Sequence, residues 1–260
     1  MGSKGEMERK YNLSGFIPKS NLHNPLCVPF AGSAVVALNH MHKSGYHASY
    51  LNDASGELIN FWTVVRDHPV AFEEKIKYLW LCKNVELWEL GPDSISMAAK
   101  FWLDHQNISR LDKVVHPDKD ITKWANILNA GRISITDKDY IDFCEYLLKL
   151  YKNDCKCSFY CDPPYRGTAS NINNKGYKSL KFDEDALFDI LKKINDAGHY
   201  VLLSYIWETK FAERLMEMGW FVKKYEIDKN NIIKNRSELL ASNEPFRNRF
   251  VKYNNISNFF

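Results

Sequence analysis

The fold of this chain is decided by the stretch Leu26–Ala34, whose sequence is Leu-Cys-Val-Pro-Phe-Ala-Gly-Ser-Ala. An apolar start followed by small residues is typical of a buried strand that ends in a tight turn. A helix is expected next over Ala34–His42, and then a short strand over Ala48–Leu51 that leads into Asn52-Asp53. The order of strand, small-residue turn, helix, strand and acidic residue predicts a doubly wound α/β fold with helices on both faces of the sheet.

The pattern changes between Pro69 and Asn129, where a mainly helical pattern rich in tryptophan indicates a small helical insertion. The alternation of strands and helices then resumes. Residues 7–68 and 130–260 are therefore expected to form one domain, interrupted by the insertion at residues 69–129. The later strands are expected at Arg132–Thr136, Ser158–Cys161, His199–Tyr205, Trp220–Ile227, Glu238–Ser242 and Phe250–Tyr253.

Composition narrows the class of protein. Hydrophobic residues make up 45% of the 260 residues and charged residues 26%, which excludes intrinsic disorder and collagen-like repeats. The six cysteines are too few for a disulfide scaffold and favour a reducing, cytoplasmic setting. The longest apolar stretch, Pro25–Leu38, is interrupted and too short to span a membrane, so no membrane partner is expected. The net charge of +3 leaves a nucleic-acid partner open.

A second informative stretch is Phe159–Tyr165, whose sequence is Phe-Tyr-Cys-Asp-Pro-Pro-Tyr. Pro163 and Pro164 cannot donate to a sheet ladder, so they must lie beyond the carboxyl end of the strand. Ligands bind at that edge of open α/β sheets. The carboxylate of Asp162, the backbone carbonyls and the ring of Tyr165 suit the binding of an exocyclic amine and stacking on its base. The alternative is an ordinary turn that ends a strand.

These motifs, in this order, resemble the Dam-type (alpha-group) adenine-N6 DNA methyltransferases. Asp162–Tyr165 is similar to their Asp-Pro-Pro-Tyr signature, Pro29–Ser33 to their methyl-donor motif Phe-x-Gly-x-Gly, and Asn52–Trp62 to their acidic motif and following helix. The resemblance implies a class I methyltransferase fold, with a Rossmann-like mixed sheet. Further similar segments are Phe182-Asp183-Glu184, Leu203-Ser204 and Arg236–Leu240.

The resemblance also implies an activity and a site. A methyl group would pass from S-adenosylmethionine to N6 of an adenine flipped out of DNA, leaving S-adenosylhomocysteine and using no metal. Asp162 and the Pro163 carbonyl would accept the two amino hydrogens, Pro164 would help to fix their geometry, and Tyr165 would stack on the base. The residues implied to bind the cofactor are Pro29, Phe30, Ala31, Gly32, Ser33, Ala34, Asp53, Ala54, Asp139, Tyr140 and Asp162.

For Asp53 and Asp139-Tyr140 a structural role is an alternative to cofactor binding, and for Ala34 the resemblance holds under one condition. Asp53 is expected to accept hydrogen bonds from ribose hydroxyls, but it could instead be an acid at a helix N-terminus. Asp139-Tyr140 resembles the motif that meets the adenine of the cofactor, and it could equally be a helix start. Ala34 stands where the donor motif has glycine, which is compatible with the motif if its φ angle is negative.

A basic loop follows the Asp-Pro-Pro-Tyr motif. Between Arg166 and Lys181 there is no acidic residue, and asparagine, glycine and tyrosine lie between the cations. Such a loop suits contact with phosphates and capture of a flipped base, with a solvated loop as the alternative. The expected partner is double-stranded DNA, bound by a monomer or weak dimer. The expected DNA-binding residues are Arg166, Lys175, Tyr177, Lys178 and Lys181.

Two departures from the family keep other functions open. The nearest candidate for its N-terminal Gly-Gly-Lys-like segment is Ser14–Lys19, which lies too close to Phe30; residues 1–6 are given no role. In the insertion, Leu103–Asn107 occupies the place of an expected recognition segment. The alternatives are a cytosine-N4 DNA methyltransferase, an RNA adenine methyltransferase and a non-catalytic nucleic-acid-binding subunit of a methyltransferase complex. A restriction-modification role and a solitary, phage Dam-like role also stay open.

Overall fold

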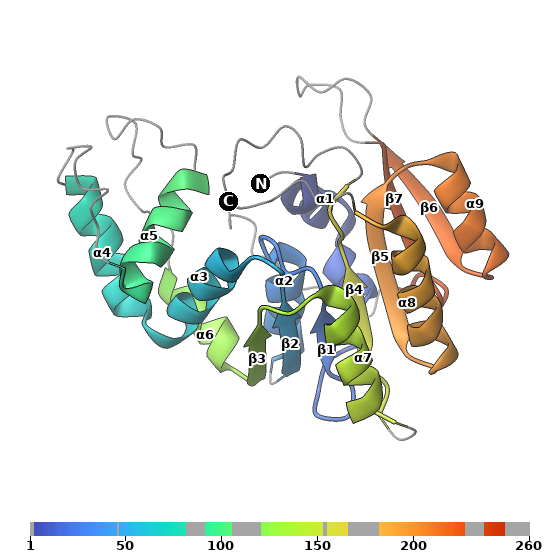
Figure 1. Cartoon of the computed structure of the whole chain (residues 1–260), viewed down its shortest axis with the longest axis horizontal. Helices are drawn as coiled ribbons and strands as arrows, with labels where there is room; N and C mark the ends of the chain where they lie inside the picture. The colour runs from blue at the N-terminus through green and yellow to red at the C-terminus, as the bar shows by residue number, and fades with distance from the viewer. Residues whose placement is uncertain are drawn as a thin grey trace.

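The sheet of this protein has seven strands in the order β3-β2-β1-β4-β5-β7-β6 (Figure 1). The computed structural model describes residues 3–45, 47–81, 92–105, 121–152, 155–165, 182–226 and 237–247. Strands β1 to β5 run parallel, and β7 pairs antiparallel with both β5 and β6. The Rossmann-like mixed sheet is therefore confirmed. The strands are β1 (Leu26–Val28), β2 (Ala48–Asn52), β3 (Arg132–Thr136), β4 (Ser158–Cys161), β5 (Tyr200–Ile206), β6 (Phe221–Glu226) and β7 (Ser237–Ser242).

Two hydrophobic cores lie on the two faces of the sheet, and the central strands contribute to both. In β1, Leu26 and Val28 belong to one core and Cys27 to the other. Alternation of this kind follows from the two-residue period of a strand. A sheet covered on both faces requires strands that are apolar throughout, which is why the segment Leu26–Val28 is buried at every position.

Helices cover both faces, as predicted. One face carries α1 (Ser3–Tyr11), the 3-10 turn η1 (Leu13–Phe16), α2 (Val35–Ser44) and α3 (Gly56–Asp67), and the other carries α7 (Tyr140–Leu150), α8 (Glu184–Asp196) and α9 (Thr209–Glu217). Ser55 caps α3 by accepting a hydrogen bond from the Leu58 N–H, and Asp183 caps α8 by accepting from the Asp185 and Ala186 N–H groups.

The described part of the insertion is helical and lies beyond β3 at one end of the sheet (Figure 1). It consists of α4 (Pro69–Leu81), α5 (Ser94–His105) and α6 (Ile121–Asn129). The Phe61 ring of α3 lies 5.7 Å from both Phe72 and Phe101, and Trp62 lies 6.1 Å from Trp124. The insertion thus shares its core with the main domain, and the boundaries 69–129 stay a prediction.

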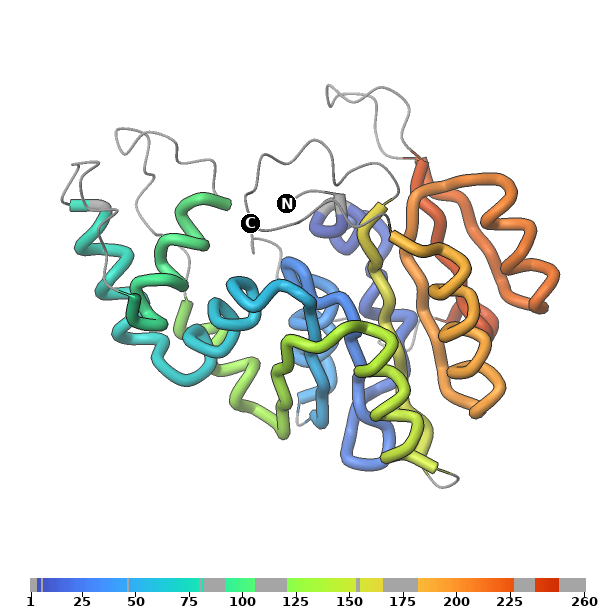
Figure 2. Tube along the Cα trace, viewed as in Figure 1, coloured from blue at the N-terminus to red at the C-terminus, as the bar shows by residue number. Residues whose placement is uncertain are grey.

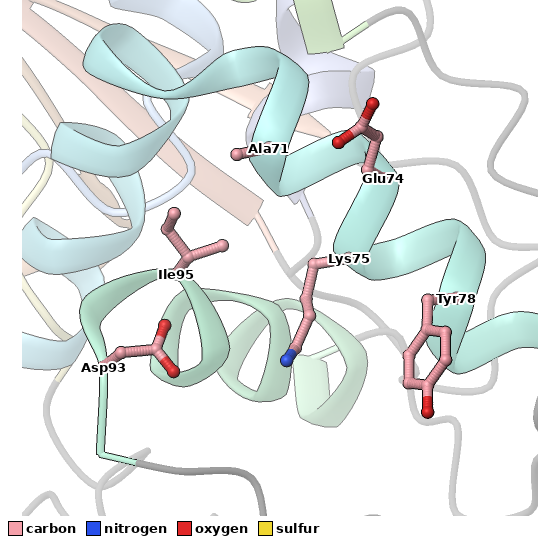
Figure 3. A pocket seen from close by; sticks show the side chains of 6 residues that line it. All are labelled: Ala71, Glu74, Lys75, Tyr78, Asp93 and Ile95. Atoms are coloured by element: carbon pink, nitrogen blue, oxygen red, sulfur yellow. The ribbon is translucent and has the colours of Figure 1, made fainter.

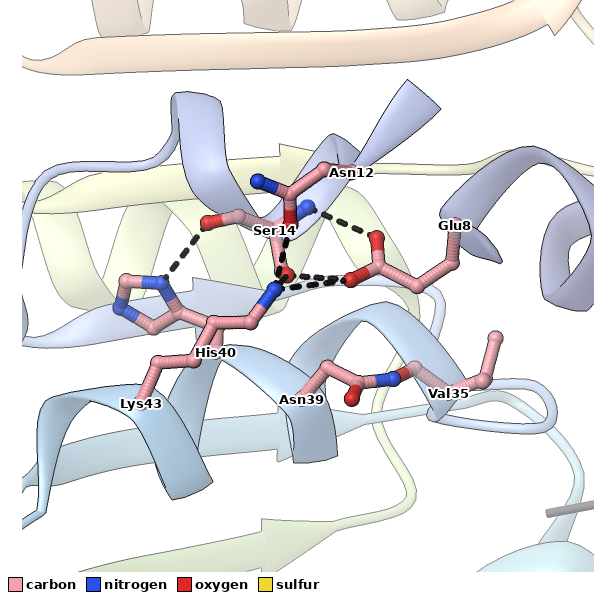
Figure 4. A network of polar contacts seen from close by, with 7 residues as sticks. All are labelled: Glu8, Asn12, Ser14, Val35, Asn39, His40 and Lys43. Carbon is pink, nitrogen blue, oxygen red and sulfur yellow. Dashed lines mark hydrogen bonds and ion pairs between the residues drawn. The ribbon is translucent and has the colours of Figure 1, made fainter. Parts of the chain in front are cut away.

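A buried polar network, which we call the anchor cluster, holds α1 against α2 (Figure 4). It consists of Glu8, Asn12, Ser14, His40 and Lys43. The Lys43 ammonium lies 3.3 Å from a Glu8 oxygen and donates to Ser14 Oγ at 2.7 Å, and it also donates to Asn12. The Ser14 N–H donates to the other Glu8 oxygen at 2.8 Å. Burial raises the pKa of Glu8 and lowers the pKa of Lys43.

Within the described ranges, no helix combines the length and the apolar character that crossing a bilayer requires.

Candidate active site at the carboxyl edge of the sheet

The two sequence motifs meet at the edge where the strand order reverses. Strands β1 and β4 are parallel neighbours, with Leu26 opposite Ser158 and Cys27 opposite Phe159. The loop after β1 and the loop after β4 therefore leave the same edge of the sheet, next to each other (Figure 1). This position is the topological switch point, where open α/β sheets bind ligands. We call Pro29–Ala34 the donor loop.

Hydrogen bonds to strand β2 and its following loop and helix hold the donor loop, and there is space beside Gly32. The Ala31 N–H donates to the Asn52 carbonyl at 2.7 Å, and the Gly32 N–H donates to Asp53 Oδ2 at 3.0 Å. The Trp62 indole N–H donates to the Gly32 carbonyl at 3.1 Å. Gly32 has φ +48°, and a Cβ at this position would meet no heavy atom within 4 Å. The positive φ of this turn favours glycine, and among the described residues no atom fills the space beside its Cα.

The condition set for Ala34, a negative φ, is not met, because its φ is +52°. It has the left-handed conformation that glycine adopts freely, at a cost of roughly 1–2 kcal/mol for a residue with a Cβ. The Ala34 N–H donates to the Ala31 carbonyl at 2.7 Å, and its own carbonyl accepts from the Leu38 N–H at 2.8 Å. The loop and the first turn of α2 together hold Ala34 in this conformation.

Asp53 and Asn52 fasten the neighbouring strand ends. The Asp53 carboxylate, which is buried, accepts from the Gly32 N–H and, through Oδ1, from the Ser55 N–H at 3.0 Å. The Asn52 side chain donates to the carbonyls of Pro29 at 3.1 Å and Lys138 at 2.9 Å. Asn52 therefore connects the ends of β1, β2 and β3, a role that its buried polar side chain at a strand end could have indicated. Contact of Asp53 with a ribose stays a prediction.

An aromatic group borders the donor loop. The Phe30 ring lies 4.9 Å from that of Tyr140, and Tyr140 lies 5.8 Å from Phe182. Burial raises the pKa of Tyr140 to about 12, so its hydroxyl stays protonated at neutral pH. Asp139 is the N-cap of α7 and accepts from the Ile141 N–H at 2.8 Å. The helix-start interpretation of Asp139 describes what the structure shows, and contact with a cofactor stays a prediction.

The Asp-Pro-Pro-Tyr motif lies directly after β4. Asp162 and Tyr165 are half-buried, Pro163 is buried and Pro164 is exposed. The Tyr165 hydroxyl donates to Glu238 Oε2 at 2.7 Å, and its ring meets that of Tyr205 edge to face at 5.5 Å. The Tyr205 hydroxyl in turn donates to Glu184 at 2.9 Å. Neighbours on two strands thus fix the position of the Tyr165 ring.

Lys4 is a candidate site residue that the sequence did not lead us to include. Its ammonium lies 3.2 Å from Asp162 Oδ1 and 2.8 Å from Glu238 Oε2, and it also donates to Ser204. Figure 2 shows the start of α1 close to the end of β4. We call Lys4, Asp162, Tyr165, Ser204 and Glu238 the strand-edge cluster. The sequence Gly2-Ser3-Lys4 is similar to the Gly-Gly-Lys-like segment of the family, but residues 1–6 were given no role.

Lys19, in the nearest candidate segment Ser14–Lys19, lies elsewhere. Its side chain is exposed, and its carbonyl accepts from the Asn24 amide at 3.2 Å. Asn24 precedes β1 and accepts from Ser158, the first residue of β4, at 3.0 Å. Lys19 is thus near the amino ends of the strands, at the edge opposite Asp162. Ser14–Lys19, the nearest candidate segment in the sequence, therefore does not place a lysine beside Asp162, because the chain passes from one edge to the other between Lys4 and Lys19.

The insertion has a cavity of its own (Figure 3). It measures about 410 Å³ and lies between α4 and α5. One of its acidic residues, Asp93, caps α5 by accepting from the Ser96 hydroxyl at 2.6 Å and from the Ser96 N–H at 2.9 Å, and these two hydrogen bonds lower the pKa of Asp93. The lining residues are Ala71, Glu74, Lys75, Tyr78, Asp93 and Ile95.

Two further expectations concern the DNA-binding residues and metals. Arg166, Lys175, Tyr177, Lys178 and Lys181 lie outside the described residues, so their role stays a prediction. In the part of the chain that the structure describes, no three His, Cys, Asp or Glu side chains are grouped so that they could hold a metal ion.

Known proteins resemble this chain in sequence and fold. Residues 109–233 match the family model of D12 class N6 adenine-specific DNA methyltransferases. The type II methyltransferase M.FokI of Planomicrobium okeanokoites is 39% identical over 71 residues, which are 26% of this chain and 11% of that protein. The chain thus spans about a tenth of the length of that relative.

Solved structures resemble the chain at low sequence identity. A DNMT2 mutant of Spodoptera frugiperda has a TM-score of 0.37 at 10% identity, covering 84% of this chain and 49% of that chain. The rRNA methyltransferase aviRa of Streptomyces viridochromogenes has a TM-score of 0.37 at 14% identity, covering 91% and 83%. An rRNA methylase of Streptococcus thermophilus has a TM-score of 0.35 at 8% identity, covering 93% and 97%.

The matched segment 109–233 contains the Asp-Pro-Pro-Tyr motif, whereas the donor loop and Lys4 lie before it. The match of this segment to the model of D12 class N6 adenine-specific DNA methyltransferases agrees with the family expected from the order of the motifs.

Proposed function

We propose that this protein transfers a methyl group from S-adenosylmethionine to the N6 amino group of adenine in double-stranded DNA. One observation carries the proposal: the donor loop and the Asp-Pro-Pro-Tyr motif leave adjacent parallel strands at one edge of the sheet. A methyl donor bound at the donor loop and an amine bound at the Asp-Pro-Pro-Tyr motif would meet at that edge. The match of residues 109–233 to an adenine-specific family supports adenine as the acceptor.

The residues around the donor loop fit the proposed cofactor. The open space beside Gly32 lets a ligand approach the backbone, and the rings of Phe30 and Tyr140 offer an apolar surface next to it. The cofactor, when bound, supplies a methyl group on a positively charged sulfur. The residues proposed to hold it are Pro29, Phe30, Ala31, Gly32, Ser33, Ala34, Asp53, Ala54, Asp139, Tyr140 and Asp162.

The chain's own residues prepare the amine. A base inside the duplex is out of reach, so the target adenine is flipped out at a cost of a few kcal/mol. Tyr165 then stacks on it, in the orientation fixed by Glu238 and Tyr205. Asp162 and the Pro163 carbonyl accept the two amino hydrogens, which turns the nitrogen lone pair out of conjugation. Preorganised acceptors and close positioning provide the rate enhancement.

Lys4 bears on the alternative of a non-catalytic subunit. That alternative rested on the absence of the family's N-terminal lysine, and Lys4 supplies a lysine 3.2 Å from Asp162. The remaining parts of the proposal are a cytoplasmic location, a monomer or weak dimer, and DNA contacts from residues 166–181. The free thiols of Cys27, Cys144 and Cys157 accord with a reducing compartment.

The test replaces Asp162 and leaves its size unchanged. Asp162→Asn exchanges one acceptor for an amide and should lower methylation of duplex DNA by about 10²–10³-fold. Asp196→Asn, on the exposed end of α8, is the matched control and should methylate like the wild type. Mass analysis of the nucleosides, with duplex DNA and RNA as substrates, identifies the acceptor. N4-methylcytosine, methylated RNA alone, or full activity of Asp162→Asn would contradict the proposal.

A further inference from the structure

Glu238 is buried at the start of β7, with its side chain closed off from solvent. One of its oxygens, Oε2, accepts from two groups: the Lys4 ammonium at 2.8 Å and the Tyr165 hydroxyl at 2.7 Å. Lys4 in turn lies against Asp162, and Tyr165 follows Asp162 in the motif. Glu238 therefore contacts both Lys4 and Tyr165, the two residues next to Asp162, which is proposed to bind the amine.

The distances show how Lys4 is shared between two carboxylates. Its ammonium is closer to Glu238, at 2.8 Å, than to Asp162, at 3.2 Å, and it also donates to Ser204 on β5. Two buried groups thus hold Lys4 beside Asp162 Oδ1. Asp162 has 23% of its side chain exposed, so it is less enclosed than Lys4, which has 11% exposed.

Tyr165 is fixed at two points. Its hydroxyl is held by Glu238, and its ring edge is packed against Tyr205, which is itself bound to Glu184. A ring that is to stack on a flipped base loses less entropy on binding when its orientation is already set. Removal of the Glu238 contact would leave only the ring packing to hold it.

We infer that Glu238 is a positioning residue, which acts on the reaction through Lys4 and Tyr165 without touching the substrate. The inference rests on the proposed function. It predicts that the contribution of the Tyr165 hydroxyl depends on Glu238, because the two form one hydrogen bond. Contributions from groups that act through each other are not additive.

The experiment is a double-mutant cycle with Tyr165→Phe and Glu238→Leu. Each single change should lower kcat by about 10-fold or more, and Tyr165→Phe should have little further effect once Glu238 is leucine. Glu238→Gln, which can still accept from Tyr165, should retain more activity than Glu238→Leu. Glu226→Gln on the neighbouring β6, exposed to solvent, is the control and should behave as wild type. Effects that simply multiply would overturn the inference.

A second measurement does not depend on activity. The protein is labelled with 3-fluorotyrosine, and the ¹⁹F resonance of Tyr165 is identified by its loss in Tyr165→Phe. Glu238→Leu should shift or broaden that resonance, whereas Glu226→Gln should leave it unchanged. An unmoved resonance in Glu238→Leu would overturn the inference. If wild-type protein methylated no nucleic acid, the proposed function would fail, and the resonance would still decide whether Glu238 positions the ring.

Discussion

The anchor cluster and the strand-edge cluster hold the same helix with the same chemistry, and they differ in exposure. Each joins a lysine to a carboxylate and a serine hydroxyl. In the anchor cluster, Lys43 and Glu8 each have 1% of the side chain exposed. In the strand-edge cluster, Lys4 has 11% and Asp162 has 23% exposed. A sealed ion pair can only order the chain, whereas one that reaches the sheet edge can also receive a ligand.

The difference in exposure also indicates that the strand-edge cluster depends on the anchor cluster more than the reverse. Glu8 and Lys4 lie one turn apart on α1, so the contact that fixes Glu8 to α2 also sets where Lys4 can reach. The anchor cluster thus supports the strand-edge cluster through the helix, and the reverse dependence is weaker because Asp162 keeps contact with water. Three changes test this relation.

The largest effect is expected from breaking the anchor cluster on one side. Lys43→Met leaves the Glu8 carboxylate buried without its cation and should lower the free energy of unfolding by about 3–5 kcal/mol. Lys43→Met combined with Glu8→Gln should recover part of the loss, because no charge is then left buried. Urea denaturation measures both. Lys192→Met, in an exposed pair with Asp196, is the control and should change stability by less than about 1 kcal/mol. Equal effects of Lys43→Met and Lys192→Met would contradict a sealed anchor.

A smaller effect on stability and a larger one on activity are expected from Lys4→Met. Methylation should fall by about 10²-fold, because Asp162 and Glu238 lose the cation between them. Stability should fall less than in Lys43→Met, since Asp162 is partly exposed and Glu238 keeps the Tyr165 hydrogen bond. Arg9→Met, on the exposed side of α1, is the matched control. Methyl transfer assays and urea denaturation of the same samples separate the two effects; a loss of stability without loss of activity would sink the distinction.

The smallest effect, for a change of one pH unit, concerns the pH dependence of the anchor cluster. Burial lowers the pKa of His40 to about 3; its Nδ1 donates to the Ser14 carbonyl at 3.3 Å, and its Nε2 lies 3.2 Å from Ser44 Oγ. A pKa below the unfolded value of about 6.5 means that the stability from neutral His40 is present above pH 6.5 and lost as pH falls toward 3. The loss is about 1.4 kcal/mol per pH unit. His40→Gln should reduce the slope of unfolding free energy against pH by one proton; an unchanged slope would show that His40 does not titrate this way.

Local patterns predicted the parts of the fold that depend on neighbouring residues. The strands at Arg132–Thr136 and Ser158–Cys161 have the expected bounds, and the expected Trp220–Ile227 is β6 (Phe221–Glu226). The strand expected at Phe250–Tyr253 lies outside the described residues. Sheet order and the place of each loop follow from strand polarity, which is why the meeting of the donor loop and Asp162 could be expected.

Contacts between distant residues could not be predicted in this way. Lys4 meets Asp162 because α1 packs so that its start lies beside the end of β4. No local sequence pattern predicts that packing. The positive φ of Ala34 could not be predicted either, because here the local preference points to the other conformation. Composition favours a negative φ for alanine, and the surrounding hydrogen bonds override that preference.

The distance along the chain between Lys4 and Glu238 has a consequence for synthesis. The two residues are 234 positions apart, and β7, which carries Glu238, pairs with both β5 and β6. The ribosome therefore releases α1 long before its partner strand exists, and the edge near Asp162 is completed only after β7 has emerged. A nascent or truncated chain that has made the donor loop and the Asp-Pro-Pro-Tyr motif still has Lys4 without its closest carboxylate. Completion of the strand-edge cluster is thus a late event, tied to the docking of β7.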